Sequence, residues 1–277
     1  MKLRLYHHPD GARVAYREAG TGPGLAILHS ATLSHREWAP IVEDLAVRYR
    51  VVLPDLPLHG DSEDRPRHPY TLEWMCEVMA GFVRDTCGPR PLVAGHELGA
   101  ELLLRATARG QLTPAKLVLM PFALHRAAPS RRLWRMAART GAVPGLDRVV
   151  AHGVKVAMRP EKGVRMTAVR NPAARDLVRH AIADVGGNAN LARSWAKFAR
   201  VWPPHGPRRE ALEELSVITC PTLLLWADAD PAFPLETATE ALDLLPDGQL
   251  RVLDRTGFLM AYDDPVGLAR ELAAFLG

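Results

Sequence analysis

The stretch Leu92-Val93-Ala94-Gly95-His96-Glu97-Leu98-Gly99-Ala100 decides how this chain folds. It begins with a short apolar run, the pattern of a strand buried on both faces of a sheet. Two glycines then flank Glu97 at the spacing Gly-x-Glu-x-Gly, which indicates a tight turn and a helix that packs close to the strand. The stretch therefore predicts a strand, a sharp turn and a helix, with Glu97 at the turn.

Seven further runs of strand character lie on either side of this turn. The first two alternate in polarity as antiparallel strands do, and the other five are nearly continuous apolar runs. Helix-length stretches separate them, and in the clearest one, 71–87, apolar residues recur at helical spacing between a capping Thr71 and Gly88-Pro89. This alternation predicts an α/β fold with a mostly parallel eight-stranded sheet and helices on both faces. The seven runs are 2–6, 13–18, 25–28, 51–53, 117–120, 223–226 and 250–253.

The alternation of strands and helices breaks after Met120 and resumes at Thr222. Between them, residues 125–216 show a helical, Arg-rich pattern, and we expect this cap segment to cover one end of the sheet. The predicted core is then divided into residues 1–124 and 217–277. From Arg126 to Ser216 the chain carries 18 Lys or Arg against 7 Asp or Glu. Such a segment can attract an acidic carrier protein or an anionic substrate, or it can consist of solvated helix faces.

The composition indicates a globular protein and excludes several classes. Hydrophobic residues make up 48% of the 277 residues, and no apolar run is long enough to cross a membrane. No leader follows Met1, so we expect a cytoplasmic protein. The basic residues are not interleaved with aromatic ones, which argues against nucleic-acid binding. Cys76, Cys87 and Cys220 show neither disulfide nor metal spacing, and nothing in the sequence calls for a metal or a cofactor.

Five stretches, taken in order, resemble the α/β-hydrolase superfamily, in particular the capped branch that includes epoxide hydrolases, haloalkane dehalogenases and C–C bond hydrolases. The resemblance covers essentially the whole chain outside the cap segment and implies the same fold. Each stretch follows a predicted strand and corresponds to a loop of that family. The stretches are Leu28-His29-Ser30-Ala31, Pro54 to Ser62, Ala94 to Ala100, Trp226 to Pro231, and Thr256 to Met260 followed by Asp264-Pro265.

Two positions depart from the family pattern. The resemblance places Glu97 where the nucleophile stands and Gly257 where the catalytic histidine stands, and residues 253–262 contain no histidine at all. An acyl-enzyme route needs a base beside its nucleophile. Ordinary serine esterase or lipase chemistry is therefore excluded unless a histidine arrives from elsewhere in the chain.

The resemblance nevertheless implies a site that can move protons. Asp230 keeps the acid position, so Glu97 and Asp230 form a candidate pair of catalytic carboxylates whose titrations are pushed apart. The backbone N–H groups of Leu98 and of Ala31 or Ser30 are the expected oxyanion hole. This equipment suits cyclisation, isomerisation, elimination or epoxide opening of a small apolar substrate that bears a carbonyl or an epoxide. The Arg-rich, Lys-poor composition resembles bacterial proteins in which such repurposed folds serve specialised biosynthesis.

Two other interpretations stay open at this point. Glu97 can activate water directly, as in a cofactor-free epoxide hydrolase, or the chain can be a non-catalytic protein that binds a ligand or a partner in the old pocket. Several histidines and aromatic residues are candidates to line that pocket, although an aromatic residue on a cap helix more often belongs to a core. They are His29, His96, His125, Trp134, Trp195, Trp202, His205 and Phe258.

Overall fold

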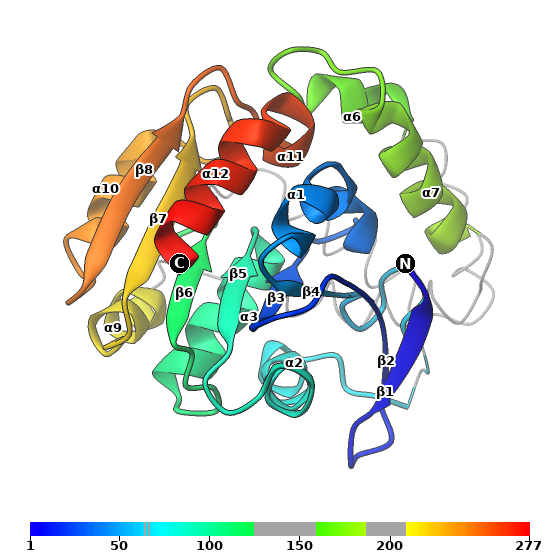
Figure 1. The fold of residues 1–277 in the computed structure, drawn as a ribbon, viewed down its shortest axis with the longest axis vertical. Coiled ribbons are helices and arrows are strands. Elements are labelled where there is room, and N and C mark those ends of the chain that lie inside the picture. Colours follow the sequence, from blue (N-terminus) through cyan, green and yellow to red (C-terminus); the bar gives the residue numbers. More distant parts are fainter. Residues whose placement is uncertain (64, 66, 125–158, 187–208) are drawn as a thin grey trace.

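Eight strands form one sheet at the centre of the molecule (Figure 1). The computed structural model describes residues 1–63, 65, 67–124, 159–186 and 209–277. The strand order is β1-β2-β4-β3-β5-β6-β7-β8; β1, β2 and β4 pair antiparallel and every other pair is parallel. The predicted mostly parallel sheet is confirmed. The strands are β1 Leu3–His7, β2 Arg13–Ala19, β3 Gly24–Leu28, β4 Arg50–Pro54, β5 Leu92–Gly95, β6 Lys116–Leu119, β7 Thr222–Ala227 and β8 Gly248–Leu253.

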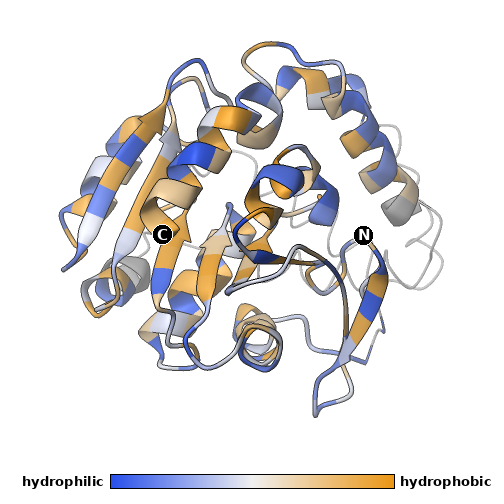
Figure 2. Ribbon diagram, viewed as in Figure 1, coloured by the Kyte–Doolittle hydropathy of each residue, from blue (hydrophilic) through white to orange (hydrophobic). Residues whose placement is uncertain are grey.

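Helices cover both faces of this sheet, because successive side chains of a buried strand point to opposite sides. Leu117 and Leu119 of β6 pack with α2, α3 and α10, whereas Val118 packs with η1, α1 and α12 on the other face. In Figure 2, hydrophobic and hydrophilic residues alternate along α7 and α12, as in helices with one buried face. The helices are η1 His35–Ile41, α1 Val42–Ala46, α2 Leu72–Cys87, α3 Leu98–Ala108, α6 Glu161–Arg165, α7 Ala174–Gly186, α9 Arg209–Ser216, α10 Leu235–Leu242, α11 Met260–Asp263 and α12 Pro265–Leu276.

Helix α2 confirms the helix expected from the periodicity of residues 71–87. The Thr71 side chain accepts a hydrogen bond from the backbone N–H of Trp74, which satisfies one of the free donors of the first turn. Gly88 ends the helix with φ at 89°, a conformation that glycine adopts without a steric penalty.

The two glycines of the deciding stretch are required by close packing of α3. A Cβ atom on Gly95 would lie 2.6 Å from the backbone of Gly99, and a Cβ on Gly99 would lie 2.5 Å from the carbonyl oxygen of Leu28. No side chain fits in either place. The first residue of α3 is therefore held directly against the ends of β3 and β5.

The cap segment docks on the chain that follows β8. The carboxylate of Asp263 accepts hydrogen bonds from the backbone N–H groups of Gly257, Ala168 and Val169, at 2.8, 2.8 and 2.9 Å. The backbone N–H of Leu259 donates to the carbonyl of Met166 at 3.1 Å. These bonds connect the end of α6 to the loop between β8 and α11.

The last part of the predicted cap segment lies in the helix layer of the core. Helix α9 packs against α3, and its Leu215 is fully buried in the same cluster as Leu102 and Leu104. The division at residues 124 and 216 itself stays a prediction, since much of the cap segment lies outside the described residues.

Replacing Asp263 with alanine tests this docking. Three backbone donors lose their acceptor, so we expect the free energy of unfolding to fall by about 2 kcal/mol and amide hydrogen exchange at Ala168 and Val169 to accelerate. Urea unfolding and exchange measured by NMR provide the readouts. Asp176→Ala is the matched control, because its exposed carboxylate pairs, within the described ranges, only with an exposed Arg179. Equal stability of the two variants would show that Asp263 does not anchor the cap segment.

Candidate active site

Glu97 lies at the sharp turn between β5 and α3, as the sequence predicts. Its backbone has φ at 48° and ψ at −105°, which costs a residue with a side chain about 1–3 kcal/mol. Two backbone bonds at 3.0 Å hold the turn: the N–H of Glu97 donates to Pro121, and the N–H of His96 donates to Leu28. The close packing of α3 and these bonds together keep the strained turn in place.

The carboxylate of Glu97 fills the expected oxyanion hole. Its Oε2 accepts hydrogen bonds from the backbone N–H of Ala31 at 2.8 Å and from that of Leu98 at 3.3 Å. Leu98 begins α3, so the helix dipole adds to the stabilisation of a negative charge here. The third expected donor, the N–H of Ser30, points elsewhere and donates to Glu37 at 2.8 Å. Two donors of the expected hole therefore bind the protein's own Glu97 carboxylate.

Directly beside the turn, His96 and Glu37 form a buried pair that the sequence did not reveal. The Nδ1 of His96 lies 2.5 Å from Oε1 of Glu37, and the two side chains are 1% and 2% exposed. Glu37 comes from η1, which the Ser34 side chain caps by accepting from the N–H of Arg36. A lone acidic residue in a short helical turn carries no motif, so only the folded chain identifies Glu37 as a partner.

Asp230 follows β7 and lines a cavity of about 300 Å³. Its Oδ1 accepts from the N–H of Ala232 at 2.8 Å, while Oδ2 is buried and has no hydrogen-bond partner among the described residues. Burial raises the pKa of Asp230, against the opposing effect of nearby N–H groups and of His96. The neutral acid therefore persists to a higher pH than in a free carboxyl group, and a neutral acid can donate a proton into the cavity.

The walls of this cavity come from the end of α6 and from the loops after β7 and β8. Most of them are apolar or small, and Arg165 adds one cation. Glu97 is not among the described residues that line it. Phe258 both lines the cavity and contacts the ring of His96, with ring centroids 4.5 Å apart. The cavity is lined by Arg165, Met166, Thr167, Ala168, Ala229, Asp230, Pro231, Ala232, Gly257 and Phe258.

After β8, Phe258 rather than Gly257 presents its side chain to the turn. That Gly257 stands at the family's histidine position stays a prediction. The Phe258 ring contacts His96, whereas a Cβ on Gly257 would meet Ala168 and Met166. Both contacts would be 3.0 Å, to backbone atoms of the docked cap segment. A side chain at residue 257 would therefore need the cap backbone to shift by a few tenths of an ångström.

His29 is held in place by both ring nitrogens. Its Nε2 accepts from the backbone N–H of Leu56 at 2.9 Å, so its Nδ1 carries the proton and donates to the carbonyl of Ser30 at 2.8 Å. Burial lowers the pKa of His29, which keeps the ring neutral. His29 joins the loops after β3 and β4 and has no nitrogen left for the substrate contact considered from the sequence.

His59 braces the same loops in the same way. Its Nε2 accepts from the N–H of Thr32 at 3.0 Å, and its Nδ1 donates to the carbonyl of Pro57 at 2.9 Å. Burial, with a contribution from His29, lowers its pKa to about 3. His29 binds Ser30 and His59 binds Thr32, the residues on either side of Ala31. The N–H of Ala31 is therefore fixed where it meets Glu97.

The loop after β4 is organised by Asp55, which is fully buried. Its carboxylate accepts from the backbone N–H and from Nδ1 of His35, both at 2.8 Å, and from the N–H of Asp61 at 3.0 Å. Burial by itself raises the pKa of Asp55, but the hydrogen bond from His35 and its charge lower it to about 2. Gly60 is required here, because a Cβ would lie 2.4 Å from that carboxylate.

Four of the predicted pocket residues, His125, Trp134, Trp195 and Trp202, lie outside the described residues, as does His205. Within the described ranges, no cluster of three or more His, Cys, Asp or Glu side chains is placed to hold a metal ion. In the same part of the chain, no helix is long and apolar enough to span a membrane.

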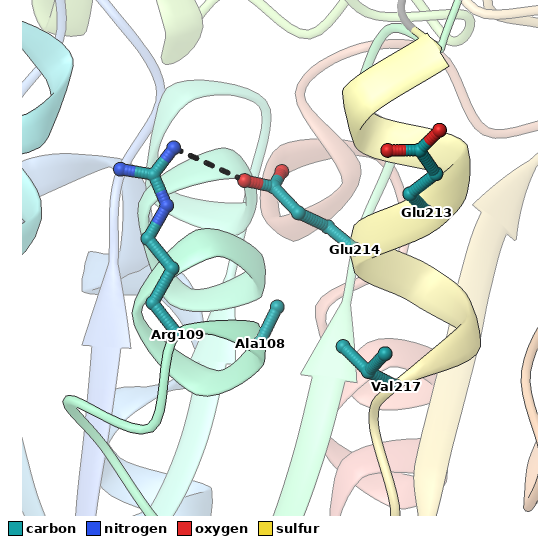
Figure 3. A pocket seen from close by; sticks show the side chains of 5 residues that line it. All are labelled: Ala108, Arg109, Glu213, Glu214 and Val217. Carbon is teal, nitrogen blue, oxygen red and sulfur yellow. Dashed lines mark hydrogen bonds and ion pairs between the residues drawn. The ribbon is translucent and has the colours of Figure 1, made fainter.

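A second cavity of about 300 Å³ lies between α3 and α9, at the opposite end of α3 from Glu97 (Figure 3). Glu214 reaches across it toward Arg109, with Nη2 and Oε1 3.3 Å apart, and lies 3.9 Å from the buried Arg105. These ion pairs fasten α9 to the core. We therefore assign this cavity to packing between the helices rather than to the site.

The mostly parallel sheet and the strand–turn–helix bend at Glu97 define the class of proteins to which the chain belongs. It is a member of the α/β hydrolase fold family, whose model matches residues 23–265.

The chain is also similar to proteins named as hydrolases. It is 23% identical to the uncharacterised hydrolase YugF of Bacillus subtilis over 96% of this chain and 95% of that protein. Among solved structures it resembles a thermophilic esterase from Thermogutta terrifontis, with a TM-score of 0.78 and 19% identity over 100% and 98% of the two chains. It also resembles the epoxide hydrolase CorEH, with a TM-score of 0.77 and 15% identity over 99% of each chain. The two structural likenesses concern the fold.

Replacing Asp230 with asparagine tests its raised pKa. As pH rises through the ordinary value of 3.8, the unfolded chain releases this proton and the folded chain keeps it, so wild-type stability falls. Asparagine cannot ionise. We therefore expect Asp230→Asn to match the wild type near pH 3 and to be more stable near pH 7, as measured by urea unfolding at both pH values. A variant that is less stable at pH 7 and equal at pH 3 would contradict the raised pKa.

A histidine placed at residue 257 or 258 tests how the loop after β8 packs against the cap segment. Gly257→His must push aside backbone atoms of the cap segment, so we expect a loss of about 1–3 kcal/mol in unfolding free energy. Phe258→His is the matched control, since it introduces the same side chain where a ring already fits. Chemical unfolding of both variants gives the comparison, and a Gly257→His protein as stable as the control would contradict this packing.

Proposed function

We propose that this protein is an α/β-hydrolase-fold enzyme that performs acid–base chemistry without a covalent enzyme intermediate. The observation that carries the proposal is the Glu97 carboxylate, which two backbone N–H groups anchor at the turn between β5 and α3. An anchored carboxylate at a helix N-terminus is stabilised as an anion. In that form it can accept a proton from a substrate.

A nucleophilic role for Glu97 fits the site less well. An ester on Glu97 would need a histidine-activated water for its release, and residues 253–262 provide no histidine. The Oε2 atom would also have to leave the two N–H groups that hold it. The triad is therefore best interpreted as degenerate, with proton transfer in place of covalent catalysis.

Asp230 supplies the complementary acid in this proposal. Burial lowers the pKa of His96, but the carboxylates of Glu37, Glu97 and Asp230 together raise it, so both proposed catalytic carboxylates lie near the same ring. Asp230 donates its proton to the carbonyl or epoxide oxygen of the substrate, while Glu97 removes a proton. Exchange with solvent then restores both groups. This sequence serves a cyclisation, an isomerisation, an elimination or an epoxide opening.

The cavity beside Asp230 bounds the part of the substrate that meets the proposed acid, since Glu97 is not among the described residues that line it. About 300 Å³ is at the lower end of the range for small-molecule sites, and the apolar walls favour a compact, largely apolar molecule. Arg165 lines the same cavity and is exposed, so it can pair with an anionic group on the substrate.

The described part of the cap segment also has a basic surface, which favours anionic substrates and acidic partner proteins. Between residues 159 and 180 the exposed cations outnumber the acidic residues Glu161 and Asp176. An acidic carrier protein that delivers the substrate is consistent with this excess, as is a free anionic substrate. The exposed cations are Arg159, Lys162, Arg165, Arg170, Arg175 and Arg179.

A second candidate function is non-catalytic binding of a ligand or partner. It is favoured by the oxyanion hole, which Glu97 itself fills and which therefore does not face a substrate in this structure. In this alternative the Asp230 cavity would bind a ligand and return it unchanged. Direct activation of water by Glu97, as in an epoxide hydrolase, is the third alternative and differs from the first in its product.

Glu97→Gln separates these functions. Small apolar epoxides and carbonyl compounds are incubated with the protein in H₂¹⁸O and analysed by mass spectrometry, with binding measured by calorimetry. We expect turnover to fall about 10²–10⁴-fold while binding is retained, because glutamine keeps the shape and loses the proton acceptor. Glu236→Gln, an exposed position on α10, is the matched control.

The outcomes discriminate clearly. Product without ¹⁸O supports cyclisation, isomerisation or elimination, and product with ¹⁸O supports water activation. Ligand binding without turnover by either protein identifies a binding protein. Undiminished turnover by Glu97→Gln excludes Glu97 as the base.

A further inference from the structure

His96 and Glu37 are held more tightly than packing alone requires. In addition to the 2.5 Å contact with His96, Glu37 uses its Oε2 to accept from the backbone N–H of Ser30 at 2.8 Å and from the Ser30 hydroxyl at 2.9 Å. A carboxylate that accepts three hydrogen bonds is fixed in position and needs no proton of its own. The Nδ1–H of His96 therefore donates to Glu37, which sets the tautomer of the ring.

The other ring nitrogen of His96, the buried Nε2, makes no hydrogen bond to any residue that the structure describes. His29 and His59, by contrast, engage both ring nitrogens with backbone groups. Buried polar atoms are normally satisfied, so an unsatisfied one beside a site calls for an explanation.

Phe258 connects His96 to the Asp230 cavity. Its ring lies 4.5 Å from the His96 ring, centroid to centroid, at an angle of 49°, and it also forms part of the cavity wall. Trp38 lies 6.3 Å away, and no ring contact links His96 to Phe233, which stacks on Phe258. Movement of the Phe258 side chain is thus the shortest way to expose His96 to the cavity.

The charges around His96 make it a stronger base than an ordinary histidine. Burial lowers its pKa, but Glu37 from η1, Glu97 from the turn and Asp230 from the loop after β7 raise it above the usual value. The side chain that packs on it from the loop after β8 is the uncharged Phe258. An imidazolium formed here would be stabilised by the adjacent carboxylates.

We propose that Glu37 and His96 form a buried carboxylate–imidazole dyad that supplies this site with a second base, with Nε2 as the proton acceptor and Phe258 as the side chain that covers it. This inference rests on the proposed function and deepens it. A proton from an O–H or acidic C–H of the substrate passes to Nε2, and the Nδ1–H bond to Glu37 persists. The imidazolium then returns the proton to the product or to solvent. The histidine absent after β8 is thereby replaced by one beside the turn.

Carbethoxylation by diethyl pyrocarbonate, followed residue by residue with mass spectrometry, tests the dyad without any substrate. The reagent reacts with a free, neutral imidazole nitrogen. We expect His96 to react slowly in the wild type and at least about ten times faster in Phe258→Ala, while His29 and His59 stay slow in both because their nitrogens are engaged. Phe233→Ala is the matched control and should leave His96 slow.

The pH dependence of the reaction tests the role of Glu37. In Phe258→Ala the midpoint of the rate profile reports the pKa of His96, and we expect Glu37→Gln in that background to lower the midpoint by about one pH unit or more. A structural role for Glu37 would not move this midpoint. Should Phe258→Ala fail to fold, Phe258→Leu and the ¹⁵N ring shifts of wild-type His96 give the same information.

Two results would overturn the dyad: His96 that stays unreactive in both Phe258 variants, or a midpoint that Glu37→Gln leaves unchanged. Neither depends on turnover. Failure of the proposed function, seen as undiminished turnover by Glu97→Gln or as no turnover by the wild type, would therefore be a separate outcome, and the dyad is judged on its own measurements.

Discussion

The structure depends on the contact between the first turn of α3 and the ends of β3 and β5. At Gly95 and Gly99 the backbones approach so closely that no Cβ fits. This contact holds Glu97 in a strained conformation and aims its carboxylate at the N–H groups of Ala31 and Leu98. Strain of this kind persists only when the surroundings over-determine it. The positions of Glu97 and His96 in the site both depend on this turn.

Three carboxylates, those of Glu37, Glu97 and Asp230, lie near the His96 ring, and each has different hydrogen-bond partners. Glu97 is stabilised by backbone N–H groups and Glu37 by Ser30 and His96, whereas burial raises the pKa of Asp230. Three carboxylates near one ring would repel one another if all were ionised and bare. Each carboxylate is therefore surrounded by a different set of hydrogen-bond donors. The two neutral histidines, His29 and His59, keep the surrounding loops rigid.

The cap segment and the site are coupled through the loop after β8. Asp263 accepts hydrogen bonds from backbone N–H groups of both the cap segment and the loop after β8. The backbone at Met166 and Ala168 occupies the space beside Gly257. The same loop places Phe258 between the contact with His96 and the wall of the Asp230 cavity. A change in how the cap segment docks would therefore move the side chain that separates the dyad from the cavity.

The sequence by itself determined the eight strands, helix α2 with its caps, and the position of Glu97 at the turn, because these follow from local periodicity and from glycines with a steric purpose. It also placed Asp230 after β7. Tertiary structure alone decided that Glu97 fills the hole, that Phe258 rather than Gly257 faces the turn, and that Glu37 pairs with His96 across 59 residues of chain. Such contacts join residues from different elements, and their geometry depends on how the helices pack on the sheet. No local pattern encodes that packing.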